Sequence, residues 1–151
     1  MKKLLFVLLV TVPFLGFGQC IEGDCENGFG TYILEKTYRM SNDSLVTWKY
    51  KYIGEWKNGK KEGMGILMNV DYPKDRYYGE WKNNKRNGFG TETWVDVETN
   101  QIGGEYIGEF KDDDMYGEGT WIFIKIPENK KSTPTEIQKG IWDGMKLVEE
   151  K

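Results

Sequence analysis

The chain of 151 residues contains no histidine and only three serines, Ser41, Ser44 and Ser132. Without histidine, the commonest general base, the Ser-His and Cys-His nucleophile pairs and every histidine-ligated metal site are excluded. No serine lies in a Gly-x-Ser-x-Gly turn. No glycine-rich loop ends in Lys-Ser or Lys-Thr, and the Gly-x-Gly pairs lack the third glycine of a dinucleotide site. We therefore expect a protein that is not an enzyme, with no catalytic residue, no cofactor and no metal.

Proline is also scarce, with 4 residues, whereas glycine has 19 and aromatic residues make up 15% of the chain. Aromatic residues favour strands and glycine favours turns, so this composition predicts short strands joined by turns. The net charge of −3 gives no general attraction to nucleic acid, and we expect no nucleic-acid partner.

Long apolar runs are absent except for one near the start, Leu4 to Leu15, which follows two lysines. It is shorter than the roughly 20 residues of a membrane-spanning helix. The run is followed by Gly16 and Gly18, two small residues spaced as in the cleavage site of a signal peptidase. We predict a signal peptide over 1–18 and export to the periplasm, the outer envelope or the medium. An uncleaved anchor, or a lipoprotein acylated at Cys20, remains an alternative.

Only two cysteines occur, Cys20 and Cys25, and they enclose four residues. In an oxidising compartment they can form a disulfide. Such a short loop removes little entropy from the unfolded chain, so we expect it to fix the N-terminal edge. A redox-active pair would have Cys-x-x-Cys spacing, and the Cys-x4-Cys spacing here favours a structural role.

One pattern, Tyr-x-Gly-Glu-Trp/Phe-Lys, begins at Tyr52 and returns at Tyr77 and Tyr106. Each copy ends in Gly-x-Gly, whose first glycine lies nine residues after the leading glycine. Shorter versions occupy 23–32 and 138–144, as expected for the end units of a stacked array. Alternating strand geometry places tyrosine, glycine and tryptophan on one face, and Asn58-Gly59 is a turn signal. Missing glycine side chains would make room for neighbouring rings.

We predict structural roles for the repeated residues, which are Gly54, Glu55, Trp56, Gly63, Gly65, Gly79, Glu80, Trp81, Gly88, Gly90, Gly108, Glu109, Phe110, Gly117 and Gly119.

This pattern resembles the MORN repeat, whose consensus runs Tyr-x-Gly-Glu-Trp-x-x-Gly-x-x-x-Gly-x-Gly. Units 52–65, 77–90 and 106–119 match it well, and the two end units match in part. The resemblance implies an all-β fold, an elongated antiparallel β-meander with one hairpin per repeat. The chain departs from the pattern at Phe110, which replaces tryptophan, and at Asp112–Asp114, which replaces the usual Asn-Gly-Lys turn.

We predict one repeat domain over 19–146, with units near 23–32, 52–68, 77–95, 106–126 and 138–144. Strands are expected over 32–40, 45–52, 52–57, 63–68, 90–97 and 121–126. Loops are expected over 70–75 and 127–136, with a turn over 98–104. The tail 147–151 is expected to fray.

Two sets of repeated side chains have competing interpretations. The repeated glutamates could serve glycoside hydrolysis, but an acid and a base need different environments, so recurrence at one position favours a structural role. The aromatic face could stack on sugars or hold a peptide, but a core between repeats is favoured. This set comprises Tyr52, Trp56, Tyr77, Trp81, Tyr106 and Phe110.

Basic residues near the turns are candidates for binding anionic lipid headgroups. They are Lys57, Lys60, Lys61, Lys82, Lys85 and Arg86. The same edge turns acidic at Asp112–Asp114, so the basic strip is not continuous and a solvated edge is favoured.

The resemblance implies membrane attachment, phospholipid contact or protein assembly. We favour a non-enzymatic scaffold or protein-interaction module, exported to a bacterial cell envelope, with an unknown protein partner. A peripheral membrane protein and a carbohydrate-acting or carbohydrate-binding protein are the alternatives. Any functional surface should lie where the units differ: the turn at Asp112–Asp114, the unequal connections and the cysteine-bearing end.

Overall fold

The computed structural model describes residues 18–39, 43–96, 101–125 and 133–151. Nearly all of the expected signal peptide therefore lies outside the described residues. The same holds for the first three residues of the expected turn over 98–104 and for most of the expected loop over 127–136.

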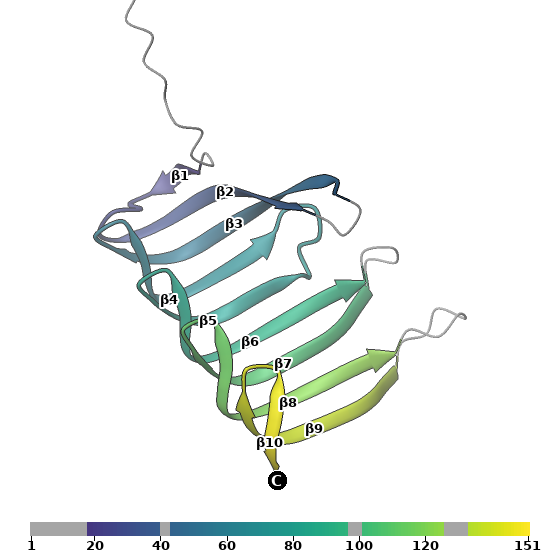
Figure 1. Cartoon of the computed structure of the whole chain (residues 1–151). Coiled ribbons are helices and arrows are strands. Elements are labelled where there is room, and N and C mark those ends of the chain that lie inside the picture. Colours follow the sequence, from purple (N-terminus) through teal and green to yellow (C-terminus); the bar gives the residue numbers. More distant parts are fainter. Residues whose placement is uncertain (1–17, 40–42, 97–100, 126–132) are drawn as a thin grey trace, which may run out of the picture.

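The described residues form one open sheet of ten antiparallel strands and no helix, which confirms the all-β prediction (Figure 1). Each strand pairs with the next one in the chain, so the sheet is a simple meander. The strands are β1 Gln19–Gly23, β2 Phe29–Arg39, β3 Leu45–Lys57, β4 Lys60–Asn69, β5 Arg76–Lys82, β6 Lys85–Asp96, β7 Gln101–Lys111, β8 Asp114–Lys125, β9 Thr133–Asp143 and β10 Lys146–Glu150.

Two-residue turns close the three complete hairpins. Both turn residues have positive φ in each: 51° and 68° at Asn58 and Gly59, 51° and 72° at Asn83 and Asn84, and 53° and 81° at Asp112 and Asp113. Positive φ at both positions defines the type I′ turn, which asparagine, aspartate and glycine tolerate best. The acidic turn that replaces the usual one therefore keeps the same backbone geometry.

A β-bulge interrupts each complete hairpin at the repeated glutamate, where the register shifts between Gly54 and Trp56, Gly79 and Trp81, and Gly108 and Phe110. A bulge bends its strand and increases the local twist. The strands bend near the turns, so the sheet is a trough (Figure 1). We call the face that bears the repeated tyrosines the inner face, and the face that bears the repeated glutamates the outer face.

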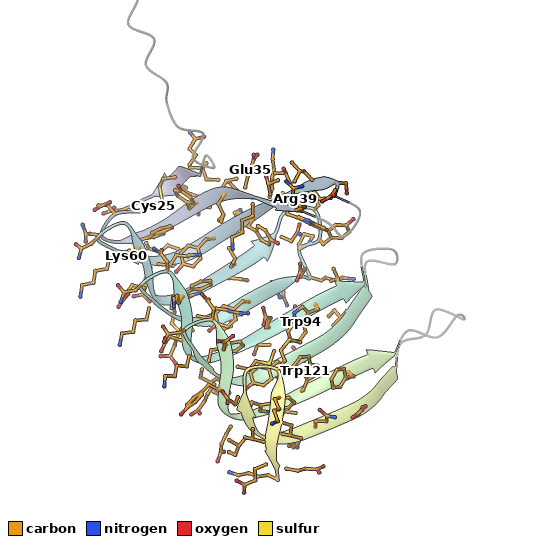
Figure 2. All side chains as sticks on the ribbon, viewed as in Figure 1. Cys25, Glu35, Arg39, Lys60, Trp94 and Trp121 are labelled. Carbon is orange, nitrogen blue, oxygen red and sulfur yellow. A yellow bond between two sulfur atoms is a disulfide. The ribbon has the colours of Figure 1, made fainter. Side chains whose placement is uncertain are left out.

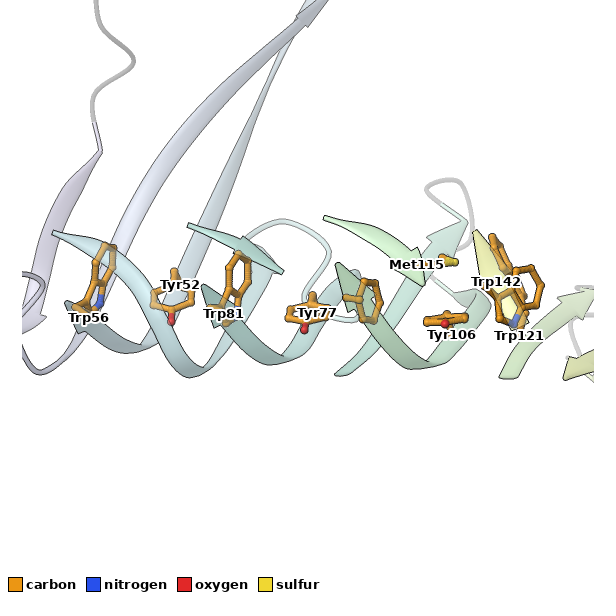
Figure 3. Close-up of a cluster of buried hydrophobic side chains, with 9 residues drawn as sticks. Tyr52, Trp56, Tyr77, Trp81, Tyr106, Met115, Trp121 and Trp142 are labelled. Atoms are coloured by element: carbon orange, nitrogen blue, oxygen red, sulfur yellow. The ribbon is translucent and has the colours of Figure 1, made fainter. Parts of the chain in front are cut away.

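The core is a row of rings along the inner face (Figure 3). Tyr52 packs edge-on against Trp56 of its own strand and Trp81 of the next hairpin, with ring centroids 5.1 and 5.3 Å apart. Tyr77 repeats this geometry with Trp81 and Phe110, at 5.2 and 5.0 Å. Edge-to-face pairs at this spacing suit the charge distribution of aromatic rings. The sheet therefore buries its core without a second layer covering it in the described part of the chain.

Three strand boundaries differ from the sequence predictions. Strand β4 begins at Lys60 rather than at Gly63, because pairing with β3 starts directly after the turn. Strand β9 begins at Thr133, within the expected loop. The tail was expected to fray, but it forms β10, in which Leu147 pairs with Trp142 and packs against the core.

Candidate functional site

The repeated glutamates lie on the outer face and bind the backbone of their own hairpin. The carboxylate of Glu55 accepts the Met64 N–H at 2.9 Å, and that of Glu80 accepts the Phe89 N–H at 2.8 Å. Glu109 accepts the N–H of Glu118 at 3.2 Å. Each carboxylate thus serves one backbone donor freed by the bulge. The three sites are alike, which is unlike an acid and a base in different environments.

Tyrosine and tryptophan join successive hairpins through their polar atoms. The Tyr77 hydroxyl donates to the carbonyl of Glu80 at 2.9 Å. The indole N–H of Trp81 donates to the carbonyl of Gly65, in the preceding hairpin, at 3.2 Å. Burial raises the pKa of Tyr77 above its usual range, and it raises that of Tyr106 to about 12. These phenols are neutral hydrogen-bond donors of the core at physiological pH.

The closing glycines leave space that the tyrosines fill. A Cβ atom at Gly90 would lie 2.6 Å from Cε2 of Tyr77, and one at Gly79 would lie 2.6 Å from the Cα of Gly90. Gly88 has a φ of +64°, and a Cβ there would lie 2.6 Å from the Glu80 carboxylate. The glycines, the tyrosine ring and the glutamate thus form one interlocked unit in each hairpin.

At the N-terminal edge, Cys20 and Cys25 form a disulfide. The disulfide ties β1 to the turn that leads into β2, as the sequence analysis expected. The carboxylate of Asp24 accepts the backbone N–H groups of Glu26 and Asn27 at 2.8 and 3.0 Å, and these bonds lower the pKa of Asp24. The N-terminal turn is therefore fixed by both a covalent bond and hydrogen bonds.

The basic candidates do not gather into one patch. The ammonium of Lys85 lies 3.5 Å from the carboxylate of Asp112. Arg86 and Lys61 lie on the inner face, because they pair with Trp81 and Trp56 across their hairpins. Lys57, Lys60 and Lys82 are exposed at the turn edge, where Figure 2 shows Lys60 projecting outward.

Arg86 is neutralised by two carboxylates. Its guanidinium binds Glu92, and it also binds Asp113 in the next hairpin, where Nε lies 3.5 Å from Oδ1. Arg86 and Glu92 are about four-fifths buried, with side-chain exposures of 21% and 18%. Burial raises the pKa of Glu92, and the positive charge of Arg86 opposes that rise.

Two open cavities lie end to end along the inner face and share Lys61 and Asn84 as lining residues. The larger, of about 760 Å³, runs from Lys61 to the disulfide and is lined by Tyr32, Leu34 and Trp56 among others. The smaller, of about 410 Å³, contains Lys36 and the Arg86 ion pairs. The inner face is therefore hollowed at its N-terminal half.

The outer face exposes large apolar side chains. Pairing places Ile53, Ile66 and Tyr78 side by side on three adjacent strands, because paired residues of neighbouring strands point to the same face. Tyr78 is 56% exposed and Phe89 57%. Other apolar residues of this face with at least two-fifths of their surface exposed include Phe29, Leu45, Met64, Tyr116 and Ile137.

Within the described ranges, no group of three or more Cys, Asp or Glu residues is arranged to hold a metal ion. Those ranges also hold no helix of the length and hydropathy needed to cross a bilayer.

The family model for the MORN repeat matches residues 52–71, 77–96 and 106–125. These matches begin at the three tyrosines of the buried row and span the three complete hairpins. The chain contains three MORN repeats. A search of curated proteins found no match. Each MORN repeat here is one bulged hairpin whose tyrosine packs against the aromatic ring of the following hairpin.

Four residues that line the two cavities and distinguish the repeats were not predicted from the sequence: Lys36, Leu67, Asn84 and Glu92. A signal was present for two of them. Leu67 and Glu92 each lie four residues after the first closing glycine, so aligning the MORN repeats would have shown an apolar residue in one and a carboxylate in the next. Their importance follows from the pairing across the bulge, which places both opposite a repeated tyrosine.

Proposed function

We propose that this MORN-repeat protein is a non-enzymatic interaction module whose outer face binds a protein of the cell envelope. The observation that carries the proposal is the exposed apolar surface around Tyr78 and Phe89, which are 56% and 57% exposed. Apolar patches of this kind, surrounded by charged side chains, mark protein-binding surfaces. The glutamates that flank them, Glu80 and Glu109, lie on the same face and supply the polar surround.

Export is part of the proposal. The disulfide between Cys20 and Cys25 is typical of an oxidising compartment. The apolar run before it has the pattern of a signal peptide. The mass of the purified protein tests this: a chain starting at Gln19 and two hydrogens lighter than its reduced form is expected. An added acyl mass on Cys20 would refute both this N-terminus and the disulfide.

Site-specific photocrosslinking in the native envelope tests the partner. A photoreactive phenylalanine analogue at Phe89 or Tyr78 should give a discrete protein adduct, because both side chains face outward. The same analogue at Lys82, which is exposed at the turn edge, is the control and should give none. Equal adducts at all three positions, or none at Phe89 and Tyr78, would contradict the proposal.

Binding to anionic membranes is a second candidate, supported by the exposed lysines Lys57, Lys60 and Lys82. Its support is weaker, because Lys85 and Arg86 are paired with carboxylates of the chain itself. Co-sedimentation with phosphatidylserine vesicles at low salt decides the matter, and a protein that stays in the supernatant would eliminate this candidate.

A further inference from the structure

Three residues occupy one equivalent position on the inner face of the three MORN repeats. Lys61, Arg86 and Met115 each pair with the ring residue of their own hairpin, across the type I′ turn. The backbone carbonyl of each accepts an N–H from the turn of the next hairpin, at distances of 2.8 to 3.1 Å. The backbone is therefore the same at the three positions, and only the side chains and their surroundings differ.

The two carboxylates around Arg86 come from defined places. Glu92 lies opposite Tyr77 on the neighbouring strand, and Asp113 is the second turn residue of the next hairpin. Besides its ion pair, Asp113 accepts the backbone N–H of Arg86 at 2.8 Å. The cation of this repeat is thus fully compensated within the chain.

Around Lys61 the same two places hold uncharged side chains. Leu67 lies opposite Tyr52, where Glu92 lies opposite Tyr77. Asn84 replaces Asp113 and accepts the backbone N–H of Lys61 at 2.8 Å. Among the described residues, no carboxylate forms an ion pair with the Lys61 ammonium. At Met115, the third position, no charge needs compensation.

Aromatic rings hold the Lys61 ammonium in the cavity. Its Nζ lies 4.3 Å from the ring centroid of Trp81 and 5.4 Å from that of Tyr52. Burial, together with the positive charge of Lys36, lowers the pKa of Lys61 to about 8, and the negative charge of Asp113 opposes this shift. A partly buried cation without a counter-charge is unfavourable, and an anion placed beside it would relieve that cost.

A second cation and an apolar hollow accompany Lys61. The ammonium of Lys36 lies 5.7 Å from the ring centroid of Tyr50 and lines the same cavity. On the other side of Lys61, the hollow of about 760 Å³ has the size of small-molecule sites, which are about 300–1,000 Å³. The carboxylates of Asp24 and Glu26 also line this hollow, so a second negative charge on the ligand would be repelled there.

We propose that Lys61 and Lys36 bind the carboxylate or phosphate of a small amphiphilic anion whose neutral apolar body lies along Tyr32, Leu34 and Trp56. The occupant is a soluble small molecule, because its charge must reach a cation inside the trough while its apolar part fills an adjoining hollow of small-molecule size. This site is on the inner face and is independent of the partner surface on the outer face.

Nuclear magnetic resonance of the ¹⁵N-labelled protein tests the site through the indole N–H signals of Trp56 and Trp81. Octanoate and phenyl phosphate are the probes. Octanol, which lacks the negative charge, and inorganic phosphate, which lacks the apolar body, are the control ligands. Octanoate, phenyl phosphate or both should shift these two signals saturably, with the control ligands at least about tenfold weaker. Octanol binding as tightly as octanoate would overturn the anion site, and shifts with phosphatidylserine vesicles alone would overturn the small-molecule assignment.

Three variants locate the anion, and a fourth, Lys146→Met, is the control. Lys61→Met places at this position the residue that the third repeat carries, and Leu67→Glu supplies the carboxylate that the second repeat carries. Each should weaken binding about tenfold or more. Lys61→Met removes the cation that contacts the anion, and in Leu67→Glu the new carboxylate already pairs with Lys61. Lys61→Arg should retain binding. Lys146→Met, at the far edge of the sheet, removes the same charge and should have no effect. Unchanged affinity in folded Lys61→Met would overturn the proposal.

The affinity should fall as pH rises through about 8, because Lys61 loses its charge there. In Lys61→Arg the fall should disappear, which separates Lys61 from every other titrating group. The charged and titratable groups that line the two cavities with Lys61 are Asp24, Glu26, Tyr32, Lys36, Tyr50, Tyr52, Asp75, Arg76, Tyr77, Arg86, Glu92 and Asp113. A fall that persists unchanged in Lys61→Arg would contradict the role of Lys61.

Discussion

In each complete hairpin, the strand before the turn carries residues that are repeated in every hairpin, whereas the strand after the turn also carries residues that differ between hairpins. The first carries the same tyrosine, glycine, glutamate and ring in all three MORN repeats, and these residues form the core and its hydrogen bonds. The second carries Lys61, Arg86 or Met115 at one equivalent position, and Leu67, Glu92 or Trp121 at another. The positions that are identical in all three repeats therefore build the trough, and the variable positions of the second strand decide whether its interior is charged or apolar.

The largest effect should come from filling the space that the repeated tyrosine occupies. In Gly90→Ala the new methyl would lie 2.6 Å from the Tyr77 ring, which packs between Trp81 and Phe110 and cannot move aside. We expect a loss of about 3 kcal/mol or more in the free energy of unfolding, measured by urea denaturation. Gly104→Ala is the control, because its nearest neighbour would be 3.3 Å away and its loss should be smaller. Equal losses would show that glycine itself, and not the fit to tyrosine, matters.

The next effect tests the compensated cation. Arg86→Met should cost about 2–3 kcal/mol near neutral pH, because it leaves the buried carboxylate of Glu92 without its partner. Without Arg86, the pKa of Glu92 rises further in the folded state. Below the pKa that Glu92 has in the unfolded chain, Glu92 is protonated and its burial stabilises the fold; this stabilisation is lost as the pH rises through the raised pKa of the folded state. The stability that Arg86→Met loses should therefore be smaller near pH 4 than near neutral pH.

A double variant sharpens this result. Arg86→Met with Glu92→Leu gives the second repeat an apolar pair at these positions, as the third repeat has with Met115 and Trp121. Most of the lost stability should return, with little dependence on pH, in the same urea titrations. A double variant as unstable as the single one would show that Arg86 acts by packing rather than by charge.

The sequence analysis predicted the fold because turns, glycines and rings recur at fixed spacing, and these residues have strong local preferences. It placed Asn58-Gly59 and the alternating faces of the strand that contains Tyr52 correctly. It could not place Leu67 opposite Tyr52 and Lys61 opposite Trp56, since this register depends on the bulge, in which residues 62–64 of β4 lie opposite Glu55 alone. It also missed β10, because a strand of five mostly charged residues has no apolar alternation, and its pairing depends on Leu147 meeting Trp142.

A third effect tests the uncompensated cation. The pKa of Lys61 is about 8 in the folded protein and ordinary, near 10.5, when the chain unfolds. Between these values the unfolded chain binds more protons, so stability should rise with pH from 8 to 10. We expect a rise of roughly 2 kcal/mol, from about 1.4 kcal/mol per pH unit reduced for partial exposure.

Lys61→Met should abolish this rise in urea denaturations at pH 7, 8, 9 and 10. The buried tyrosines, whose pKa values are raised in the fold and lie near 10 in the unfolded chain, oppose this rise as the pH approaches 10. They do so equally in both proteins, so the difference between the unsubstituted protein and Lys61→Met is the quantity to compare. Lys146→Met, on the exposed edge strand, should keep the rise. An equal rise in the Lys61→Met variant would show that Lys61 is as well solvated as an ordinary surface lysine.

The smallest effect concerns the repeated glutamate. Glu80→Ala should cost about 1 kcal/mol, because the N–H of Phe89 loses its acceptor but is near enough to solvent to bind water. Glu80→Gln keeps an acceptor oxygen in place and should cost less, as should the same change at Glu55, which binds the N–H of Met64 in the same way. Equal and small losses at the two positions are what a repeated structural role requires. If a glycosidase activity were detected and Glu80→Gln abolished it while Glu55→Gln did not, the two carboxylates would have different roles, and the structural account of the repeat would be wrong.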